Sequence, residues 1–191
     1  MSFELIVIGA SLGGLHALIA VLDGLPAAFP LPLAIVQHRG AGVESGISEL
    51  LQRHTRLIVT EVEDKDPIVA GRVFLAPADY HLLVEPDRTF ALSTEAPIRY
   101  ARPSIDVLFE SAADVYREKL VGVLLTGASA DGARGAQRIK QQGGWLIVQD
   151  PATAESKVLP EAGLAATPVD EVVGLNRIGE SLRHLAAVVR E

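Results

Sequence analysis

Short aliphatic runs alternate along this chain with longer segments of helical spacing. The first run, residues 5–8, is apolar at every position, which is typical of a parallel strand covered on both faces. It stops at residues 9–11, and apolar residues then recur at helical intervals over residues 15–22. The pattern predicts a strand, a tight turn and a helix that ends near Gly24.

The same alternation continues to the end of the chain. Aliphatic runs predict further strands at 33–37, 57–62, 72–75, 81–85, 120–125, 145–148 and 171–174. Helical spacing predicts helices at 47–54, 105–116, 159–165 and 176–189. A further helix is predicted after the segment TGASADGARG, residues 126–135, and ends at the stop formed by Gly143 and Gly144. Ser45 and Ser104 are predicted to cap the helices that follow them.

The order of these elements predicts the fold class. Segments 72–75 and 81–85 are joined by a short turn and followed by another short run, which predicts a hairpin or small meander. Elsewhere strands and helices alternate. We therefore expect an α/β fold, with a doubly wound, mostly parallel sheet, helices on both faces and one antiparallel hairpin insertion.

Composition narrows the class of protein. With 191 residues and 49% apolar residues, one domain with one substantial core is expected. The chain has no Cys, which excludes disulfides and a thiol nucleophile. It has no apolar run near 18 residues and no basic segment before the first strand, so we expect no membrane insertion and a cytoplasmic location. A net charge of -7 argues against nucleic acid as a partner.

Three polar residues follow predicted strands and suggest a reaction. Ser11 follows the first strand, His38 the second, and Asp131 lies a few residues after the strand at 120–125. The carboxyl ends of parallel strands meet at one edge of a sheet, where ligands bind. Serine, histidine and aspartate together perform nucleophilic acyl transfer: the imidazole takes the hydroxyl proton, and the carboxylate orients the imidazole.

Simpler roles for these residues stay open at this point. Ser11 is also suited to cap a helix, His38 to a structural place at a strand end, and Asp131 to cap the helix that follows it. His16, one turn into the first helix, is an alternative base for Ser11.

Nucleotide binding is the main rival hypothesis. Residues 9–14, GASLGG, follow a strand and resemble the dinucleotide turn G-x-G-x-x-G, with Ser11 in place of the middle glycine. That fingerprint also requires an acidic residue at the end of the second strand, where this chain has Gln37 and His38. The missing carboxylate and the added hydroxyl favour hydrolysis.

Several segments, in order, resemble the catalytic domain of the chemotaxis receptor methylesterases, the CheB family. They are IVIGASLGG, VQHRG, FLAPADYHL, RPSIDVLFESAA, LLTGASADGARG, VQDPATA and LPEAG. The resemblance implies Ser11 as nucleophile, His38 as base and then acid, and Asp131 as the orienting carboxylate. It implies an oxyanion held by backbone N–H groups, which we assign to Leu12 and Ala128.

The resemblance also implies the substrate. This is a methyl-esterified glutamate on the cytoplasmic helices of a chemoreceptor, hydrolysed with release of methanol, and the same site is expected to act on a glutamine side-chain amide. No cofactor and no metal are expected. The alternatives are a catalytically weakened scaffold or binding module of a signalling complex, and an esterase that acts on another substrate.

Two departures from the family pattern bear on activity. The aspartate loop reads TGASADGA, with Ala128 and Ser129 where the family usually has Met and Gly. Serine is less permissive than glycine if this position needs a positive φ. Residues 1–191 are expected to form a single methylesterase-like catalytic domain without the receiver domain of well-known members, so the chain acts without that switch, meets a separate regulatory protein, or is part of a longer protein.

Four arginines stand near the predicted sheet edge. They are Arg39, Arg99, Arg102 and Arg134. As charged side chains, they are candidates to dock acidic receptor helices. Ordinary surface arginines are the alternative.

Overall fold

A parallel sheet of seven strands forms the centre of the computed structural model, which describes residues 2–39 and 46–187. The strand order is β3-β4-β2-β1-β7-β8-β9, so β1 is the middle strand. The strands are β1 (Leu5–Ala10), β2 (Leu33–Gln37), β3 (Ile58–Glu61), β4 (Arg72–Leu75), β7 (Leu120–Leu124), β8 (Trp145–Gln149) and β9 (Glu171–Val173). All six residues of β1 are buried, which explains its unbroken apolar run.

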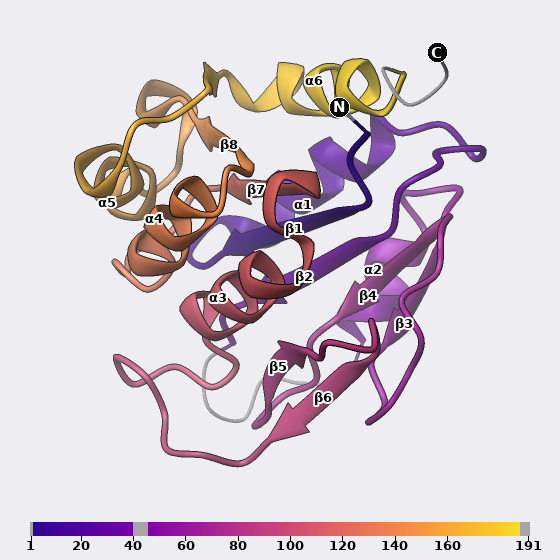
Figure 1. Ribbon diagram of the computed structural model, residues 1–191. Coiled ribbons are helices and arrows are strands. Elements are labelled where there is room, and N and C mark those ends of the chain that lie inside the picture. The colour runs from indigo at the N-terminus through magenta and orange to yellow at the C-terminus, as the bar shows by residue number, and fades with distance from the viewer. Residues whose placement is uncertain (1, 40–45, 188–191) are drawn as a thin grey trace.

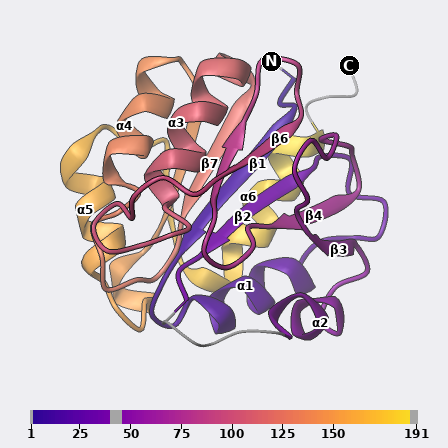
Figure 2. The same ribbon diagram turned by 90° about the horizontal axis from the view of Figure 1, so that it is seen from below.

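Helices cover both faces of the sheet (Figures 1 and 2). One face is covered by α1 (Gly14–Asp23), α2 (Ile47–Gln52) and α6 (Leu175–Ala187). The other is covered by α3 (Ile105–Tyr116), α4 (Ala133–Gln141) and α5 (Val158–Ala166). Two single-turn 3₁₀ helices, η1 (Arg117–Lys119) and η2 (Pro151–Thr153), precede β7 and follow β8. The predicted doubly wound α/β fold is confirmed.

The antiparallel insertion is confirmed, but its strands differ from the expected pair. β5 (His81–Val84) pairs with β6 (Phe90–Ser93), whereas β4 lies in the main sheet, parallel to β2 and β3. Side chains on both faces of β4 are buried, since Val73 belongs to one apolar core and Phe74 to the other. A strand buried on both faces fits a parallel sheet, so the prediction that 72–75 pairs with 81–85 was wrong.

Helix ends follow the predicted signals in most places. α1 ends at Asp23 with Gly24 as its C-cap, and the Ser104 hydroxyl accepts a hydrogen bond from Val107 N (3.4 Å) at the start of α3. The predicted cap Ser45 lies outside the described residues. In the described parts of the chain, no helix combines the length and the apolar character needed to cross a membrane.

Candidate active site

Strand register places Ser11 and His38 side by side. Ala10, the last residue of β1, is paired with Gln37, the last residue of β2, and the next residues are Ser11 and His38. His38 N donates to Ala10 O (2.9 Å), and Ser11 N donates to Thr126 O (3.0 Å) beyond the end of β7. The chain passes from β1 to β2 on one side and later to β7 on the other. Ser11 therefore lies at the point where the winding reverses, a common ligand-binding place in such sheets.

The loop after β7 runs against the turn that carries Ser11. A Cβ added to Gly127 would lie 2.8 Å from Ser11 Cβ, so a larger residue at this position would clash. Gly127 N donates to Ser156 O (3.0 Å), and Gly127 O accepts from Leu159 N (2.9 Å). The glycine thus lets the loop that carries Asp131 approach the serine.

His38 and Asp131 form a direct pair. His38 Nε2 lies 2.7 Å from Asp131 Oδ2; the aspartate side chain is fully buried, and the histidine side chain is 11% exposed. An ionised carboxylate only accepts hydrogen bonds, so Nε2 carries the proton of the neutral imidazole. The lone pair is then on Nδ1, which is the nitrogen able to take a proton from a hydroxyl.

Three further donors hold the Asp131 carboxylate at the start of α3. Oδ2 accepts from Ile105 N (2.7 Å), and Oδ1 accepts from the Ser104 hydroxyl (2.7 Å) and Asp106 N (3.1 Å). Burial raises the pKa of Asp131, but the hydrogen bonds from His38, Ser104 and these N–H groups outweigh it, so the pKa lies below its ordinary value. Asp131 therefore stays ionised beside His38.

Asp131 does not cap the helix that follows it. The N-cap of α4 is Gly132, without a side-chain cap, and Asp106 of α3 serves α4 instead: its Oδ1 accepts from Gly132 N (2.9 Å) and Gly135 N (2.7 Å). Burial raises the pKa of Asp106 above its ordinary value, against the effect of these two N–H groups, and the nearby charge of Asp131 raises it further. Likewise, the N-cap of α1 is Gly13, so Ser11 does not cap α1.

The departures in the aspartate loop are accommodated. The residue with a left-handed backbone is Gly132 (φ 116°), not Ser129. The Ser129 hydroxyl accepts a hydrogen bond from Asp131 N (3.1 Å) and so supports the loop. Serine in place of glycine thus adds a contact here without backbone strain.

Ser11 and His38 line one hollow of about 570 Å³, a size suited to a small ligand or a side chain. The other lining residues are Leu12, Gly13, Gly14, Leu15, His16, Gln37, Arg39 and Glu155. No hydrogen bond joins the Ser11 hydroxyl to His38 in the part of the chain that the structure describes; catalytic hydrogen bonds often shorten only when substrate binds. Within that same part, no group of His, Cys, Asp or Glu is arranged to hold a metal ion.

The four arginines predicted to dock substrate are in different situations. The Arg39 side chain is buried and donates to Glu61 Oε1 (2.9 Å) and Ala76 O (3.2 Å). Arg102 donates to the carbonyls of Thr94 and Glu95, and Arg134 pairs with Glu110. Arg99 is exposed in a turn closed by hydrogen bonds between Ile98 and Ala101.

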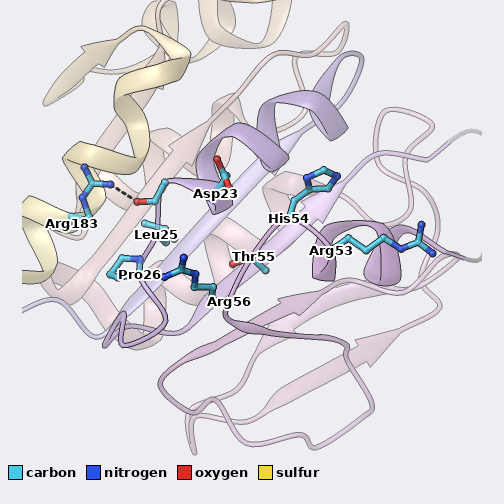
Figure 3. A pocket seen from close by; sticks show the side chains of 9 residues that line it. Asp23, Leu25, Pro26, Arg53, His54, Thr55, Arg56 and Arg183 are labelled. Atoms are coloured by element: carbon cyan, nitrogen blue, oxygen red, sulfur yellow. Dashed lines mark hydrogen bonds between the residues drawn. The ribbon is translucent and has the colours of Figure 1, made fainter.

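A second hollow, of about 460 Å³, lies at the other end of α1 (Figure 3). It is lined by Asp23, Gly24, Leu25, Pro26, Arg53, His54, Thr55, Arg56 and Arg183. Helices α1 and α2 both end here, and Arg183 donates to Gly24 O. Basic side chains stabilise the carbonyl ends of helices, and the bond from Arg183 to Gly24 O is such a contact.

Several supporting residues were not predicted from the sequence. Ser104 was predicted as a cap, but its bond to Asp131 was not. His81 of β5 accepts from Ser104 N through Nδ1 (3.2 Å), and its Nε2 lies 3.1 Å from Ala96 O. The role of Gln37 could have been suspected from the sequence, because it is a polar residue at the end of a wholly buried strand. A buried amide needs hydrogen-bond partners.

These features define a class of protein. The fold is a wound α/β sheet, and its carboxyl edge holds a strand-end serine beside the hydrogen-bonded histidine–aspartate pair that serine hydrolases use. The model of the CheB methylesterase family matches residues 6–182, and the chain belongs to this family.

Individual relatives agree with this assignment. A Leptospira interrogans protein, provisionally named a protein-glutamate methylesterase/protein-glutamine glutaminase, is 46% identical over 94% of this chain and 93% of its own length. An Anaeromyxobacter dehalogenans protein-glutamate methylesterase/protein-glutamine glutaminase is 43% identical over 95% of this chain but 53% of its own length. The crystal structure of the Thermotoga maritima CheB methylesterase catalytic domain has a TM-score of 0.92 and 32% identity, covering 97% of this chain and 100% of that chain.

Proposed function

We propose that this chain hydrolyses glutamyl methyl esters on the cytoplasmic helices of chemoreceptors, releasing methanol and leaving a glutamate carboxylate. The observation that carries the proposal is the 2.7 Å contact between His38 Nε2 and the buried carboxylate of Asp131, together with the hollow that His38 and Ser11 line. The names of the relatives, protein-glutamate methylesterases, support the substrate.

In the first half of the reaction, Ser11 Oγ attacks the ester carbonyl while His38 Nδ1 takes the hydroxyl proton. The imidazolium that forms is stabilised by Asp131, whose pKa is low enough to keep it charged. The tetrahedral intermediate collapses, methanol leaves with the proton from His38, and the glutamyl group stays as an ester on Ser11.

In the second half, His38 takes a proton from water as the water attacks the acyl-serine. The proton then returns to Ser11 Oγ, and the glutamate carboxylate is released. The same steps on a glutamine side chain release ammonia instead of methanol. This second reaction is supported by the glutaminase in the relatives' names.

The oxyanion of the intermediate needs donors that are ready before substrate arrives. We assign this role to the N–H groups of Leu12 and Ala128. Leu12 precedes α1 and lines the hollow, and its carbonyl is held by the Thr126 hydroxyl (2.9 Å). Ala128 is exposed and follows Gly127, which lies against Ser11.

Docking of the receptor helices is assigned mainly to Arg99. Arg39, Arg102 and Arg134 are engaged by groups of this chain, whereas Arg99 is exposed. A cytoplasmic location follows from the proposed substrate. Residues 2–39 and 46–187 would act together as one catalytic domain, since they share one central sheet.

The test is methanol release from methylated chemoreceptor signalling fragments, with wild type and Ser11→Ala measured side by side. Release by wild type and loss of several orders of magnitude in Ser11→Ala would support both the reaction and the nucleophile. Equal release by both proteins would contradict the assignment of Ser11. No release by a folded wild type would favour a scaffold module, and release from other methyl esters alone would indicate a different substrate.

A further inference from the structure

The side chain of Gln37 joins the two strand ends that carry the site. It is 7% exposed, and its Nε2 donates to Ser11 O (2.9 Å) and to His38 O (2.8 Å). Ser11 is the residue after β1 and His38 the residue after β2. One amide group therefore fixes the backbone of the residue proposed as nucleophile relative to that of the residue proposed as base.

The other end of this amide has no hydrogen bond. Gln37 Oε1 is buried without a partner among the described residues, and it lies against Gly14, where an added Cβ would be 2.1 Å away. A buried acceptor without a partner destabilises the folded state. Proteins keep such unfavourable features mainly where a functional site needs them. The two hydrogen bonds that Gln37 Nε2 donates offset the destabilisation caused by the unpaired Oε1.

The turn that carries Ser11 is also hydrogen-bonded to Thr126, on the β7 side of β1. Thr126, beyond β7, accepts from Ser11 N through its carbonyl (3.0 Å) and donates its hydroxyl to Leu12 O (2.9 Å). These bonds fix the turn to β7, but neither reaches His38. The side-chain link between Ser11 and His38 therefore depends on Gln37.

We propose that Gln37 is a positioning residue, which holds Ser11 and His38 at the separation and orientation that proton transfer requires. The inference rests on the proposed function, because it assigns Gln37 a role in the same reaction. A displacement of about 1 Å between reacting groups lowers rates by about 10²-fold. Loss of the two bonds should thus affect the chemical step more than substrate binding.

Gln149 provides a matched control within the chain. Like Gln37, it is a buried glutamine at the end of a central-sheet strand, β8. Its Oε1 accepts from Thr126 N (2.8 Å), and its Nε2 donates to Thr153 O (3.0 Å). Replacing Gln149 removes a buried amide of equal size without breaking a bond to Ser11 or His38.

The experiment compares Gln37→Met and Gln149→Met in the full chain, because methionine has a similar length and no amide. We expect Gln37→Met to lower kcat for methyl ester hydrolysis by about 10²-fold, with KM within about threefold of wild type. Labelling of Ser11 by a fluorophosphonate should slow in parallel. Gln149→Met should keep kcat within about fivefold while it lowers thermal stability at least as much.

The inference is overturned if folded Gln37→Met keeps kcat and labelling rate within about threefold of wild type, or if Gln149→Met loses as much of both. If Gln37→Met does not fold, Gln37→Leu replaces it, since leucine also lacks the amide and places no charge beside the buried carbonyl groups. Fluorophosphonate labelling needs no receptor substrate. A wild type that labels but releases no methanol would therefore contradict the proposed function and still allow the test of Gln37.

Discussion

Asp106 belongs to α3 but caps α4, whereas Asp131 precedes α4 but caps α3. Asp131 directly precedes the N-cap of α4, yet its carboxylate accepts from Ile105 N and Asp106 N at the start of α3. Asp106, in the first turn of α3, accepts from Gly132 N and Gly135 N at the start of α4. The two exchanged caps fix the aspartate loop to α3 and thereby fix the carboxylate that faces His38.

The first prediction concerns Asp131→Asn. The amide keeps the size of the side chain but loses the charge that stabilises the imidazolium and offers a donor where His38 needs an acceptor. We expect kcat to fall by about 10⁴-fold, the scale of the same change in other serine-hydrolase triads. Steady-state methanol release measures this, and circular dichroism should show an unchanged fold. A loss below about tenfold would argue against the role assigned to Asp131.

The second prediction concerns acid unfolding. The pKa of Asp131 in the folded protein lies below the ordinary value of 3.8, so its ionisation stabilises the fold above that value, and this contribution is lost as the pH falls through the folded-state pKa. Urea unfolding between about pH 5 and pH 2 should show a steep loss of free energy in wild type and a shallower one in Asp131→Asn. Equal slopes would contradict the expectation.

The third prediction concerns Asp106, whose pKa is shifted in the opposite direction to that of Asp131. Because burial raises the pKa of Asp106, its ionised form is disfavoured in the folded state, and a neutral amide should replace it well. We expect Asp106→Asn to keep the free energy of unfolding at pH 7 within about 1 kcal/mol of wild type, or to raise it. Asp106→Ala, which leaves the α4 N–H groups without an acceptor, should lower it by about 2 kcal/mol. Denaturant titration measures both variants, and an equal loss of unfolding free energy in Asp106→Asn and Asp106→Ala would contradict this explanation.

The fourth prediction tests substrate docking. Arg99→Glu should raise the apparent KM for methylated receptor fragments several-fold at low salt and leave hydrolysis of a small methyl ester unchanged, because Arg99 lies outside the hollow. Arg56→Glu is the control, since Arg56 lies at the second hollow, at the far end of α1 (Figure 3). Equal KM values for the two variants would remove Arg99 from the docking surface.

Much of the fold was predictable because its signals are local. Aliphatic runs, helical spacing, the stop at Gly24 and the N-cap at Ser104 indicated the elements in order, and parallel strand ends placed Ser11 and His38 at one edge. The partner of β4 was not predictable from its neighbours in sequence. Strand pairing depends on which faces become buried, and Val73 and Phe74 are covered by different layers.

The sequence by itself determined the chemical groups of the site, the edge of the sheet where they gather and the family to which the chain belongs. Only the tertiary structure decided which helix Asp131 caps, that Ser129 supports the aspartate loop, and that Gln37 bonds to both strand ends. The reason is physical. Spacing along the chain specifies local hydrogen bonds, but bonds between groups as far apart as His38 and Asp131 form only where packing brings separate elements together.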